Sequence, residues 1–347
     1  MQQQLIPTNN PNVFSNIVLF LNICNKLQDD KSKLYLLSLC KSTYLFKCKV
    51  VFQQFPFDFY CHSMSMNSNI QLPHRFKSIT IDKESPFLLN ILSSFSFKYI
   101  NYNINIQIPA GILMEPLKKL TFGELYNQPI NEFTFPETVK ELIFGDSFQQ
   151  PISRNQLPKS LVILDLGYNN HQLLDSLPHG LEEIKFGEIF NRKIMPGEIP
   201  TTVKRLVFGY AFNQPLDPFT LPANIEYIQF GYSFNQYIQY GSLPSHLKTV
   251  IFGHNFQQPF SSNSLPNTLE YLVLPKEYQS FSNNVYPQSI KEIQYGISNL
   301  NQSNLNPIKP TIIYNNQSHF QSNYSIYKKW LPIIVGTMAM FSYTLFK

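Results

Sequence analysis

The sequence is poor in alanine, with four residues in 347, and charged residues make up only 14% of it. Its 27 basic and 22 acidic side chains are scattered, and no dense block of Lys and Arg with interleaved aromatic residues occurs. Nucleic acid is therefore not an expected partner. The apolar content is carried instead by 30 Phe and 20 Tyr. This is enough apolar surface for a core, so the chain is not expected to be disordered overall.

Cysteine is also scarce, and no residue pattern of a catalytic or metal site is present. None of the cysteines forms a Cys-x-x-Cys pair or accompanies a histidine cluster, so we expect buried thiols and no metal or cofactor. The seven histidines are dispersed, and no Gly-x-Gly-x-x-Gly, P-loop or His-Glu-x-x-His string occurs. We therefore predict no enzymatic activity and no small-molecule substrate. The four cysteines are Cys24, Cys40, Cys48 and Cys61.

What the sequence does contain is a period of 22 residues, marked by glycine. Proline repeats in phase with it, and Pro275 takes the place of a glycine before the marker returns at Gly296. Two markers that stay in phase over many turns indicate a repeat architecture. One step, from Gly167 to Gly187, is shortened to 20 residues. The glycines are Gly123, Gly145, Gly167, Gly187, Gly209, Gly231 and Gly253, and the prolines are Pro136, Pro158, Pro178, Pro200, Pro222, Pro244, Pro266 and Pro287.

A single unit, read from Leu221, is LPANIEYIQFGYSFNQYIQYGS. Ile225, Ile228 and Phe230 have the L-x-x-L-x-L spacing of a leucine-rich-repeat strand, in which alternate side chains enter the core. Phe234 is expected to add a second core layer on the returning arm. Proline before the strand blocks a helix, and glycine after it suits a tight turn or a backbone with positive φ.

The motif that follows each strand reads YNQP, FQQP, FNQP, FNQY and FQQP at residues 126–129, 148–151, 212–215, 234–237 and 256–259. These residues resemble the FNIP repeat family, a variant of the leucine-rich repeat. The resemblance covers residues 117–296, and weaker copies at 72–82 and 97–103 extend it to about ten units over 70–296. It implies a solenoid of short parallel β-strands joined by turns, serving as a non-enzymatic protein-interaction scaffold.

An amide recurs five residues after the strand phenylalanine, where it is predicted to replace the asparagine of the standard leucine-rich pattern. Buried amides at a fixed height can hydrogen-bond backbone groups of the next coil and form a polar ladder. The alternative is that these residues are solvent-exposed polar turns. The amides are Asn127, Gln149, Asn191, Asn213, Asn235 and Gln257.

Two residues in each strand leave the core and are expected to line the concave surface of the solenoid. In the strands between residues 205 and 273 they combine aromatic and aliphatic side chains with few charges, which is typical of protein interfaces. We predict the protein partner there. The alternative is that Tyr, Val and Ile reflect strand propensity alone. The predicted partner-binding residues are Arg205, Val207, Tyr227, Gln229, Thr249, Ile251, Tyr271 and Val273.

Residues 1–60 do not follow the repeat, and two helices are predicted at 14–27 and 33–48. The string LYLLSLCKSTYLF, at residues 34–46, resembles the latter half of an F-box, although the valine before Cys40 is missing. The resemblance implies a surface for the adaptor of a cullin-type ubiquitin ligase, formed by Leu36, Leu37, Leu39 and Cys40. The alternative is a helical cap that shields the first repeat.

Residues 297–327 are rich in Asn, Ser and Gln and predict a flexible linker. The segment 328–347 follows, with 17 uncharged residues between flanking lysines. As a helix they would span about 25 Å, slightly less than a hydrocarbon core. No basic leader opens the sequence, so no signal peptide is expected. The membrane-facing residues would be Trp330, Ile333, Ile334, Val335, Phe341, Leu345 and Phe346.

We therefore predict a carboxyl-terminal tail anchor in a thin membrane, either the endoplasmic reticulum or the outer mitochondrial membrane, with the bulk of the chain in the cytosol. The alternative is a capping helix on the last repeat. The predicted function is a membrane-tethered scaffold for a protein partner, and the runner-up is a substrate adaptor of a cullin ubiquitin ligase.

Overall fold

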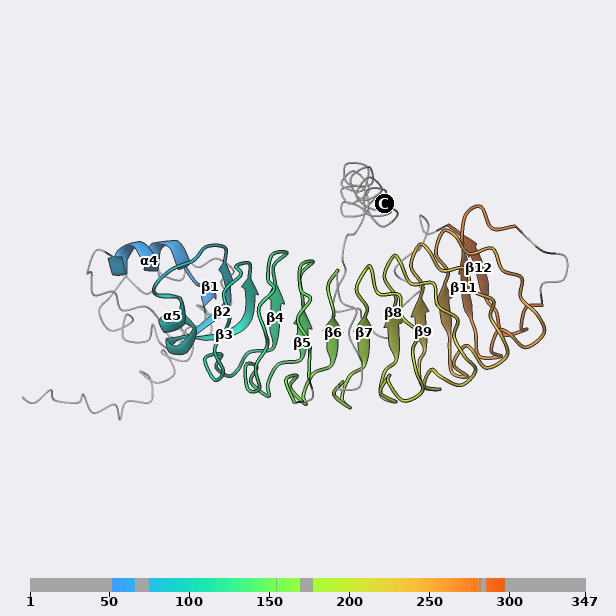
Figure 1. The fold of residues 1–347 in the computed structure, drawn as a ribbon, viewed down its shortest axis with the longest axis horizontal. Helices are drawn as coiled ribbons and strands as arrows, with labels where there is room; N and C mark the ends of the chain where they lie inside the picture. The colour runs from blue at the N-terminus through green and yellow to red at the C-terminus, as the bar shows by residue number, and fades with distance from the viewer. Residues whose placement is uncertain are drawn as a thin grey trace, which may run out of the picture. The chain divides into compact units, whose positions relative to one another are not determined.

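The computed structural model describes residues 52–65, 75–153, 155–168, 177–279, 281 and 285–296. Within them, twelve strands form one sheet in which the strand order follows the chain and every neighbouring pair is parallel (Figure 1). The strands are β1 (Phe52–Gln54), β2 (Arg75–Ile81), β3 (Ser96–Tyr102), β4 (Lys119–Phe122), β5 (Glu141–Ile143), β6 (Ile163–Asp165), β7 (Glu183–Lys185), β8 (Arg205–Val207), β9 (Tyr227–Gln229), β10 (Thr249–Ile251), β11 (Tyr271–Leu274) and β12 (Glu292–Tyr295).

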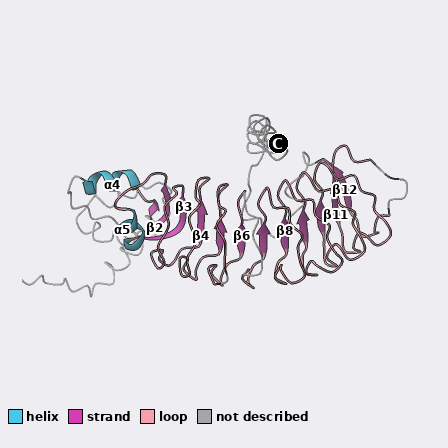
Figure 2. Ribbon diagram, viewed as in Figure 1, coloured by secondary structure: helices cyan, strands magenta, loops and turns pink. Residues whose placement is uncertain are grey.

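Each strand belongs to one coil, and the rest of the coil is mostly turn and loop (Figure 2). Pairing sets Tyr227 against Thr249, and Thr249 against Tyr271, so the 22-residue period of the sequence is the register of the sheet. The parallel-strand solenoid predicted from the sequence is therefore confirmed. The two weaker copies form β2 and β3, and the sheet begins at Phe52, ahead of the predicted start at residue 70.

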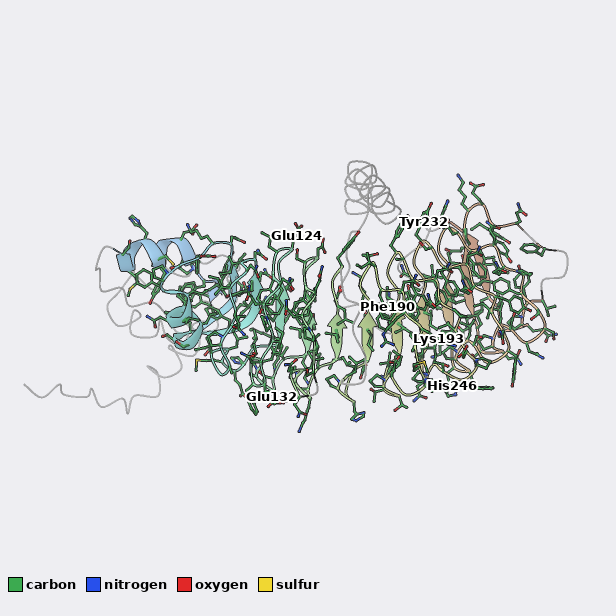
Figure 3. The ribbon with its side chains drawn as sticks, in the orientation of Figure 1. Glu124, Glu132, Phe190, Lys193, Tyr232 and His246 are labelled. Atoms are coloured by element: carbon green, nitrogen blue, oxygen red, sulfur yellow. The ribbon has the colours of Figure 1, made fainter. Side chains whose placement is uncertain are left out.

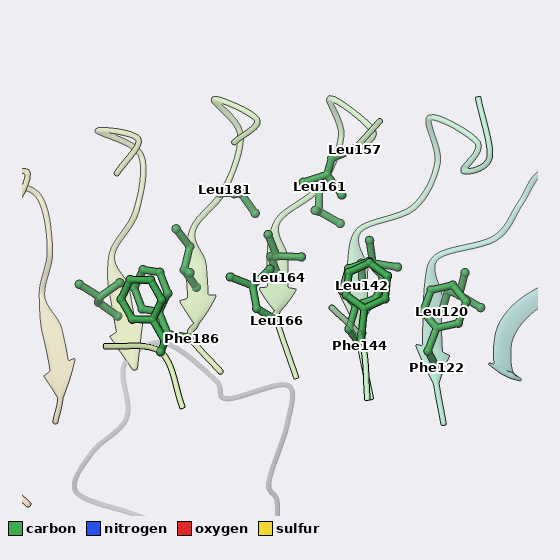
Figure 4. Close-up of a cluster of buried hydrophobic side chains, with 14 of the residues drawn as sticks. Leu120, Phe122, Leu142, Phe144, Leu157, Leu161, Leu164, Leu166, Leu181 and Phe186 are labelled. Atoms are coloured by element: carbon green, nitrogen blue, oxygen red, sulfur yellow. The ribbon is translucent and has the colours of Figure 1, made fainter. Parts of the chain in front are cut away.

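The core consists of columns of equivalent side chains that run from coil to coil, as the close-up in Figure 4 shows for β4 to β7. Ile225, Ile228, Phe230 and Phe234, the four predicted core positions of one unit, are all at most 2% exposed. The leucines before and within the strands repeat this pattern. Because one coil leaves its apolar face open, only the neighbouring coils can bury it.

Phenylalanine rings stack along two of these columns. Phe208 and Phe230 are parallel with centroids 5.4 Å apart, and Phe212 and Phe234 are 6.0 Å apart in the next column. Within one coil, Phe230 and Phe234 stack at 3.9 Å. Replacing such a ring with alanine is expected to lower the unfolding free energy by about 3–5 kcal/mol, through lost burial and the cavity left behind.

The glycine after each strand is required for close packing and, at most positions, not for a positive φ. Gly167 has φ +73°, but Gly209, Gly231 and Gly253 are not in the left-handed region. A Cβ on Gly231 would lie 1.8 Å from the carbonyl oxygen of Gly209, and one on Gly253 would lie 1.7 Å from that of Gly231. Of the two predicted reasons for glycine, the positive φ does not hold at these positions, whereas the turn does: the backbone N–H of Phe234 donates to the Gly231 carbonyl three residues earlier. Glycine is also needed there because the backbone of the preceding coil occupies the space of a side chain.

The predicted amide ladder is present. The backbone N–H of Asn235 donates to Oδ1 of Asn213 at 2.9 Å, and Nε2 of Gln236 donates to the same oxygen at 3.0 Å. The same pair of bonds links Asn213 and Gln214 to Asn191. The ladder amides are half-buried or exposed instead of fully buried. They therefore bridge neighbouring coils while remaining partly accessible to solvent.

In the described part of the first coils lie the helices α4 (Phe57–Ser65) and α5 (Leu88–Ser94). Phe57 and Tyr60 of α4 are buried, as are Leu88, Ile91 and Leu92 of α5. The helices predicted at 14–27 and 33–48, and the segment 328–347, lie outside the described residues. No helix in the described part of the chain is long and apolar enough to cross a membrane.

Candidate protein-binding surface

The outer face of the sheet carries two columns of side chains that alternate with the buried core residues. Most of them are half-buried. The first column is Lys119, Glu141, Ile163, Glu183, Arg205, Tyr227, Thr249, Tyr271 and Glu292, and the second is Thr121, Ile143, Asp165, Lys185, Val207, Gln229, Ile251, Val273 and Gln294. We call this surface the strand face.

From β4 to β8 the charges of the strand face pair with one another. Lys119 Nζ lies 3.1 Å from a carboxylate oxygen of Glu141, and Lys185 Nζ lies 3.2 Å from one of Asp165. Arg205 Nε lies 3.3 Å from Glu183. Because each cation already has an anion on a neighbouring strand, this half of the face offers little net charge to a partner.

The pairing ends where Arg205 meets Tyr227. The guanidinium carbon of Arg205 lies 3.6 Å from the centroid of the Tyr227 ring, which is a close cation–π contact. The Tyr227 hydroxyl donates to Oε1 of Gln229 at 2.9 Å. From Tyr227 to Val273 the outer residues are aromatic, amide, hydroxyl or aliphatic. The strand face thus changes at β8 from a charged half to an uncharged half.

Burial shapes the electrostatics at this boundary. It raises the pKa of the Glu183 carboxyl, and the nearby Arg205 opposes the shift without cancelling it. Burial likewise raises the pKa of the Tyr227 phenol, again against the influence of Arg205. Arg205 thus acts on both of its neighbours in the first column, Glu183 on β7 and Tyr227 on β9.

The eight residues predicted to bind a partner all lie on the strand face and in register. Arg205, Val207, Tyr227, Gln229 and Tyr271 are half-buried and present part of their side chains. The other three are almost fully covered: Thr249 is 7% exposed, and Ile251 and Val273 are 2% exposed.

The low exposure of Ile251 and Val273 is explained by their place in the second column. Ile251 and Val273 are short side chains in register between the longer Gln229 and Gln294. The surface open to a partner is therefore formed by Arg205, Val207, Tyr227, Gln229 and Tyr271.

A groove that the sequence did not predict follows the edge where the coils enter the strands. It has a volume of about 620 Å³ and includes His246, which Figure 3 shows on the edge opposite Tyr232. Lysine and glutamate alternate along it, with Lys204 paired to Glu182 at 3.2 Å and Lys248 to Glu226 at 2.6 Å. The alternation of lysine and glutamate at the repeat spacing is the feature of the sequence from which this groove could have been predicted. The groove is lined by Glu182, Thr201, Thr202, Lys204, Asn224, Glu226, His246, Lys248 and Thr268.

The groove is polar and has no group arranged as an activated nucleophile. The hydroxyl of Thr268 donates to the backbone carbonyls of Ser245 or Leu247, both within 2.9 Å. The Thr202 hydroxyl is used in the same way, and Asn224 Nδ2 donates to the Thr201 carbonyl. These side chains hold the coils together.

The opposite edge carries a stack of rings at the position that follows the glycine. Tyr210 and Tyr232 are parallel with centroids 4.8 Å apart, and Tyr232 and His254 are 4.7 Å apart. The backbone N–H of Tyr210 donates to a carboxylate oxygen of Glu188 at 2.8 Å. The stack repeats at the coil spacing and presents ring edges to solvent, so we assign it to the support of the coils.

Several predicted features cannot be placed on this surface. The adaptor residues Leu36, Leu37, Leu39 and Cys40, and the membrane residues from Trp330 to Phe346, lie outside the described residues. In the part of the chain that the structure describes, no group of three or more His, Cys, Asp or Glu could hold a metal ion. Cys61, the described cysteine, is a free thiol.

The repeat unit with its strand, glycine and amide ladder matches the FNIP Repeat family at residues 126–169, 148–189, 190–233 and 234–277. Residues 126–277 consist of FNIP repeats. The family match covers the coils of β5 to β11, which contain the whole uncharged half of the strand face up to Val273. None of the curated proteins matches the chain.

A solved structure with a similar fold is described as "The crystal structure of CroV588 a novel circular LRR protein structure". It is 31% identical over the matched part, with a TM-score of 0.57, and the match covers 65% of this chain. The chain spans only 34% of the length of CroV588. The likeness supports the assignment of the FNIP solenoid to the leucine-rich-repeat type.

Proposed function

We propose that this chain is a non-enzymatic scaffold that holds a protein partner on the uncharged half of its strand face. The observation that carries the proposal is the change at Arg205 and Tyr227, where internally paired charges give way to aromatic, amide and aliphatic side chains. Tyr and Arg are enriched at the centres of protein interfaces, and a rigid parallel sheet presents them without a large loss of conformational entropy.

The experiment compares two full-length variants with the wild type. Tyr227→Ser combined with Tyr271→Ser removes both half-buried rings from the uncharged half, whereas Lys119→Ser alters the equivalent column on β4. Proteins that bind the tagged wild-type chain are quantified by mass spectrometry. The scaffold proposal predicts partners that the double variant loses and the Lys119→Ser control keeps. Equal recovery by both variants, with unchanged melting curves, would contradict it.

We further propose that residues 328–347 tether the scaffold to a membrane. The support is the sequence: 17 uncharged residues from Trp330 to Phe346, with lysines on both sides. A chain that ends at Tyr327 should leave the membrane fraction, whereas the full chain should resist carbonate extraction. A truncated chain that still resists carbonate would exclude the tether.

The second candidate function is a substrate adaptor of a cullin ubiquitin ligase. It rests on the F-box-like string at 34–46, and it uses the same strand face to hold a substrate. A cullin adaptor should then co-purify with the chain and be lost on Leu36→Asp with Leu39→Asp. If no cullin adaptor co-purifies with the wild-type chain, the adaptor function is excluded and the scaffold function is retained.

A further inference from the structure

One position of the coil, the third residue of a four-residue turn that precedes the strand, adopts the left-handed backbone conformation in most of the described coils. Its φ values lie between +61° and +86°. Glycine and asparagine suit this conformation, because glycine has no Cβ and the short amide of asparagine can hydrogen-bond locally. The residues at this position are Gly111, Phe133, Asn155, Gly197, Phe219, Gly241 and Asn263.

Neither the backbone conformation nor burial in the core favours phenylalanine at the two positions of this column where it occurs. Phe133 and Phe219 have φ of +61° and +62°, where a bulky side chain is strained. Their side chains are 79% and 73% exposed, so they gain almost no burial in the fold. An exposed ring on a strained backbone is an arrangement that binding, not stability, explains.

Phe219 differs from Phe133 in having a second exposed ring beside it. Tyr240, on the next coil, is 66% exposed, and its ring lies 6.0 Å from that of Phe219 at an interplanar angle of 84°. A Cβ on Gly241 would lie 2.9 Å from Cζ of Phe219, so the absent side chain leaves room for the Phe219 ring. Among the described residues, Phe133 has no ring contact, and the position after it in the column, which corresponds to Gly241, is Asn155.

We infer that Phe219 and Tyr240 form a docking notch for an extended, proline-containing segment of another protein. Two exposed rings at nearly a right angle leave a corner that a flat pyrrolidine ring fills against both faces. Aromatic surfaces of this kind bind the polyproline II conformation. The exposed Tyr240 hydroxyl can donate to a backbone carbonyl of such a segment, which has no intramolecular hydrogen bonds of its own.

The spacing of the coils also favours this occupant. A polyproline II helix repeats every three residues, or about 9.3 Å. Neighbouring strands of a sheet are about 4.8 Å apart, so two steps along the stack of coils cover about 9.6 Å. Met195, which is 51% exposed, and Tyr240 lie on coils two steps apart, with Phe219 on the coil between them. A β-strand repeats its side chains at about 6.7 Å and an α-helix at about 5.4 Å, and both would drift out of step with the coils.

Charge contributes little to the notch. The ion pair nearest in sequence joins Lys193 to Asp217 at 2.6 Å, so its two charges are already matched. The chemistry selects an apolar, extended ligand instead of a charged one. The notch lies before the strands, so its occupation is independent of the partner proposed for the strand face.

The test uses the full chain and a fluorescein-labelled ten-residue polyproline, with a Gly-Ser ten-mer as the unrelated peptide. Fluorescence anisotropy should show saturable binding of polyproline only. Phe219→Asn should weaken binding by about tenfold or more, as expected for a central aromatic contact. Asparagine is accommodated at the equivalent positions 155 and 263, so this variant should fold. Phe133→Asn relieves the same backbone strain at a similarly exposed ring, and it should leave the affinity unchanged.

Three outcomes would overturn the inference. The first is no saturable binding of polyproline by the wild type, and the second is equal binding by Phe219→Asn and the wild type. The third is a wild-type dimer that Phe219→Asn converts to a monomer in analytical sedimentation. In that case the notch holds a second copy of the chain. Tyr240→Ser provides a second variant, and it should weaken polyproline binding while leaving the melting curve unchanged.

Discussion

At the scale of single residues, Tyr126 is the largest of the side chains in the described part of the chain whose buried hydroxyl has no hydrogen-bond partner; the others are Thr138 and Thr220. Tyr126 occupies the place where the next coil has Phe148, and it is fully buried. Among the described residues its hydroxyl has no partner, and burial raises its pKa. Tyr102, in an adjacent coil, is equally buried, but its hydroxyl donates to the Ile106 carbonyl at 3.0 Å.

We predict that Tyr126→Phe leaves the unfolding free energy unchanged or raises it by about 1 kcal/mol, because it removes an unsatisfied polar group. Tyr102→Phe should lower the unfolding free energy by about 0.5–1.5 kcal/mol through its lost hydrogen bond. Chemical denaturation of both variants checks this difference. A loss of stability in Tyr126→Phe as large as that in Tyr102→Phe would mean that the Tyr126 hydroxyl has a partner.

Glu183 gives a prediction in pH. Because burial raises its pKa above the ordinary value of 4.5, the folded protein retains this proton to a higher pH than the unfolded chain does. The stability of the wild type should therefore fall relative to Glu183→Gln as pH rises through this window. Denaturation at a series of pH values from about 4 to 7 measures the difference.

Arg205 provides the internal control for that measurement. It lowers the pKa of Glu183, so Arg205→Met should raise this pKa further and make the trend steeper. The opposite trend, in which the wild type gains stability over Glu183→Gln as pH rises, would show that the ion pair outweighs the burial.

At the scale of the coil, the amide ladder is the element that joins neighbouring turns on the arm returning from the strand. Its existence could be predicted from the sequence, because an amide recurs at a fixed distance from the strand phenylalanine. Its partial exposure could not, since solvent access depends on how closely the neighbouring arms approach. The steric reason for the glycines could not be predicted either, because it also depends on how closely neighbouring coils approach. At most of these positions the carbonyl of the preceding coil, and not the φ of the glycine, leaves no room for a Cβ.

Asn213 tests the ladder, because its Oδ1 accepts from both the Asn235 backbone and Gln236. Asn213→Ala should lower the unfolding free energy by about 1–2 kcal/mol, since it leaves the Asn235 N–H without an acceptor. Hydrogen exchange at the Asn235 amide should accelerate as well. Asn213→Asp keeps an acceptor oxygen and should lose less than half as much stability. If both variants lose equal stability, the amide acts by packing and not by hydrogen bonding.

At the scale of the whole molecule, the solenoid is a stack in which each coil contacts its neighbours. The sequence predicted its register, strands and core well, because the glycine and proline markers repeat in phase. The strand face was predicted less completely. Burial of Ile251 and Val273 depends on the side chains across two strands, and the strained Phe133 and Phe219 look like ordinary turn residues until φ is known.

Deletion of one whole coil tests this architecture. Removing residues 210–231 joins equivalent positions, so every column and ladder stays in register, and a cooperative thermal transition should remain at a somewhat lower temperature. Removing only residues 210–220 places core positions against polar ones and should abolish the transition. A chain that tolerates both deletions equally would not be held together by register-specific stacking.

The central claim is that the uncharged half of the strand face holds a protein partner, and photo-crosslinking tests it most directly. A benzophenone amino acid is placed at Gln229 in one full-length chain and at Thr121 in another. Both positions are half-buried in the second outer column, one on β9 and the other on β4. We expect covalent protein adducts from position 229 and none from position 121 after irradiation in cells. Adducts from neither position, or equally from both, would contradict it.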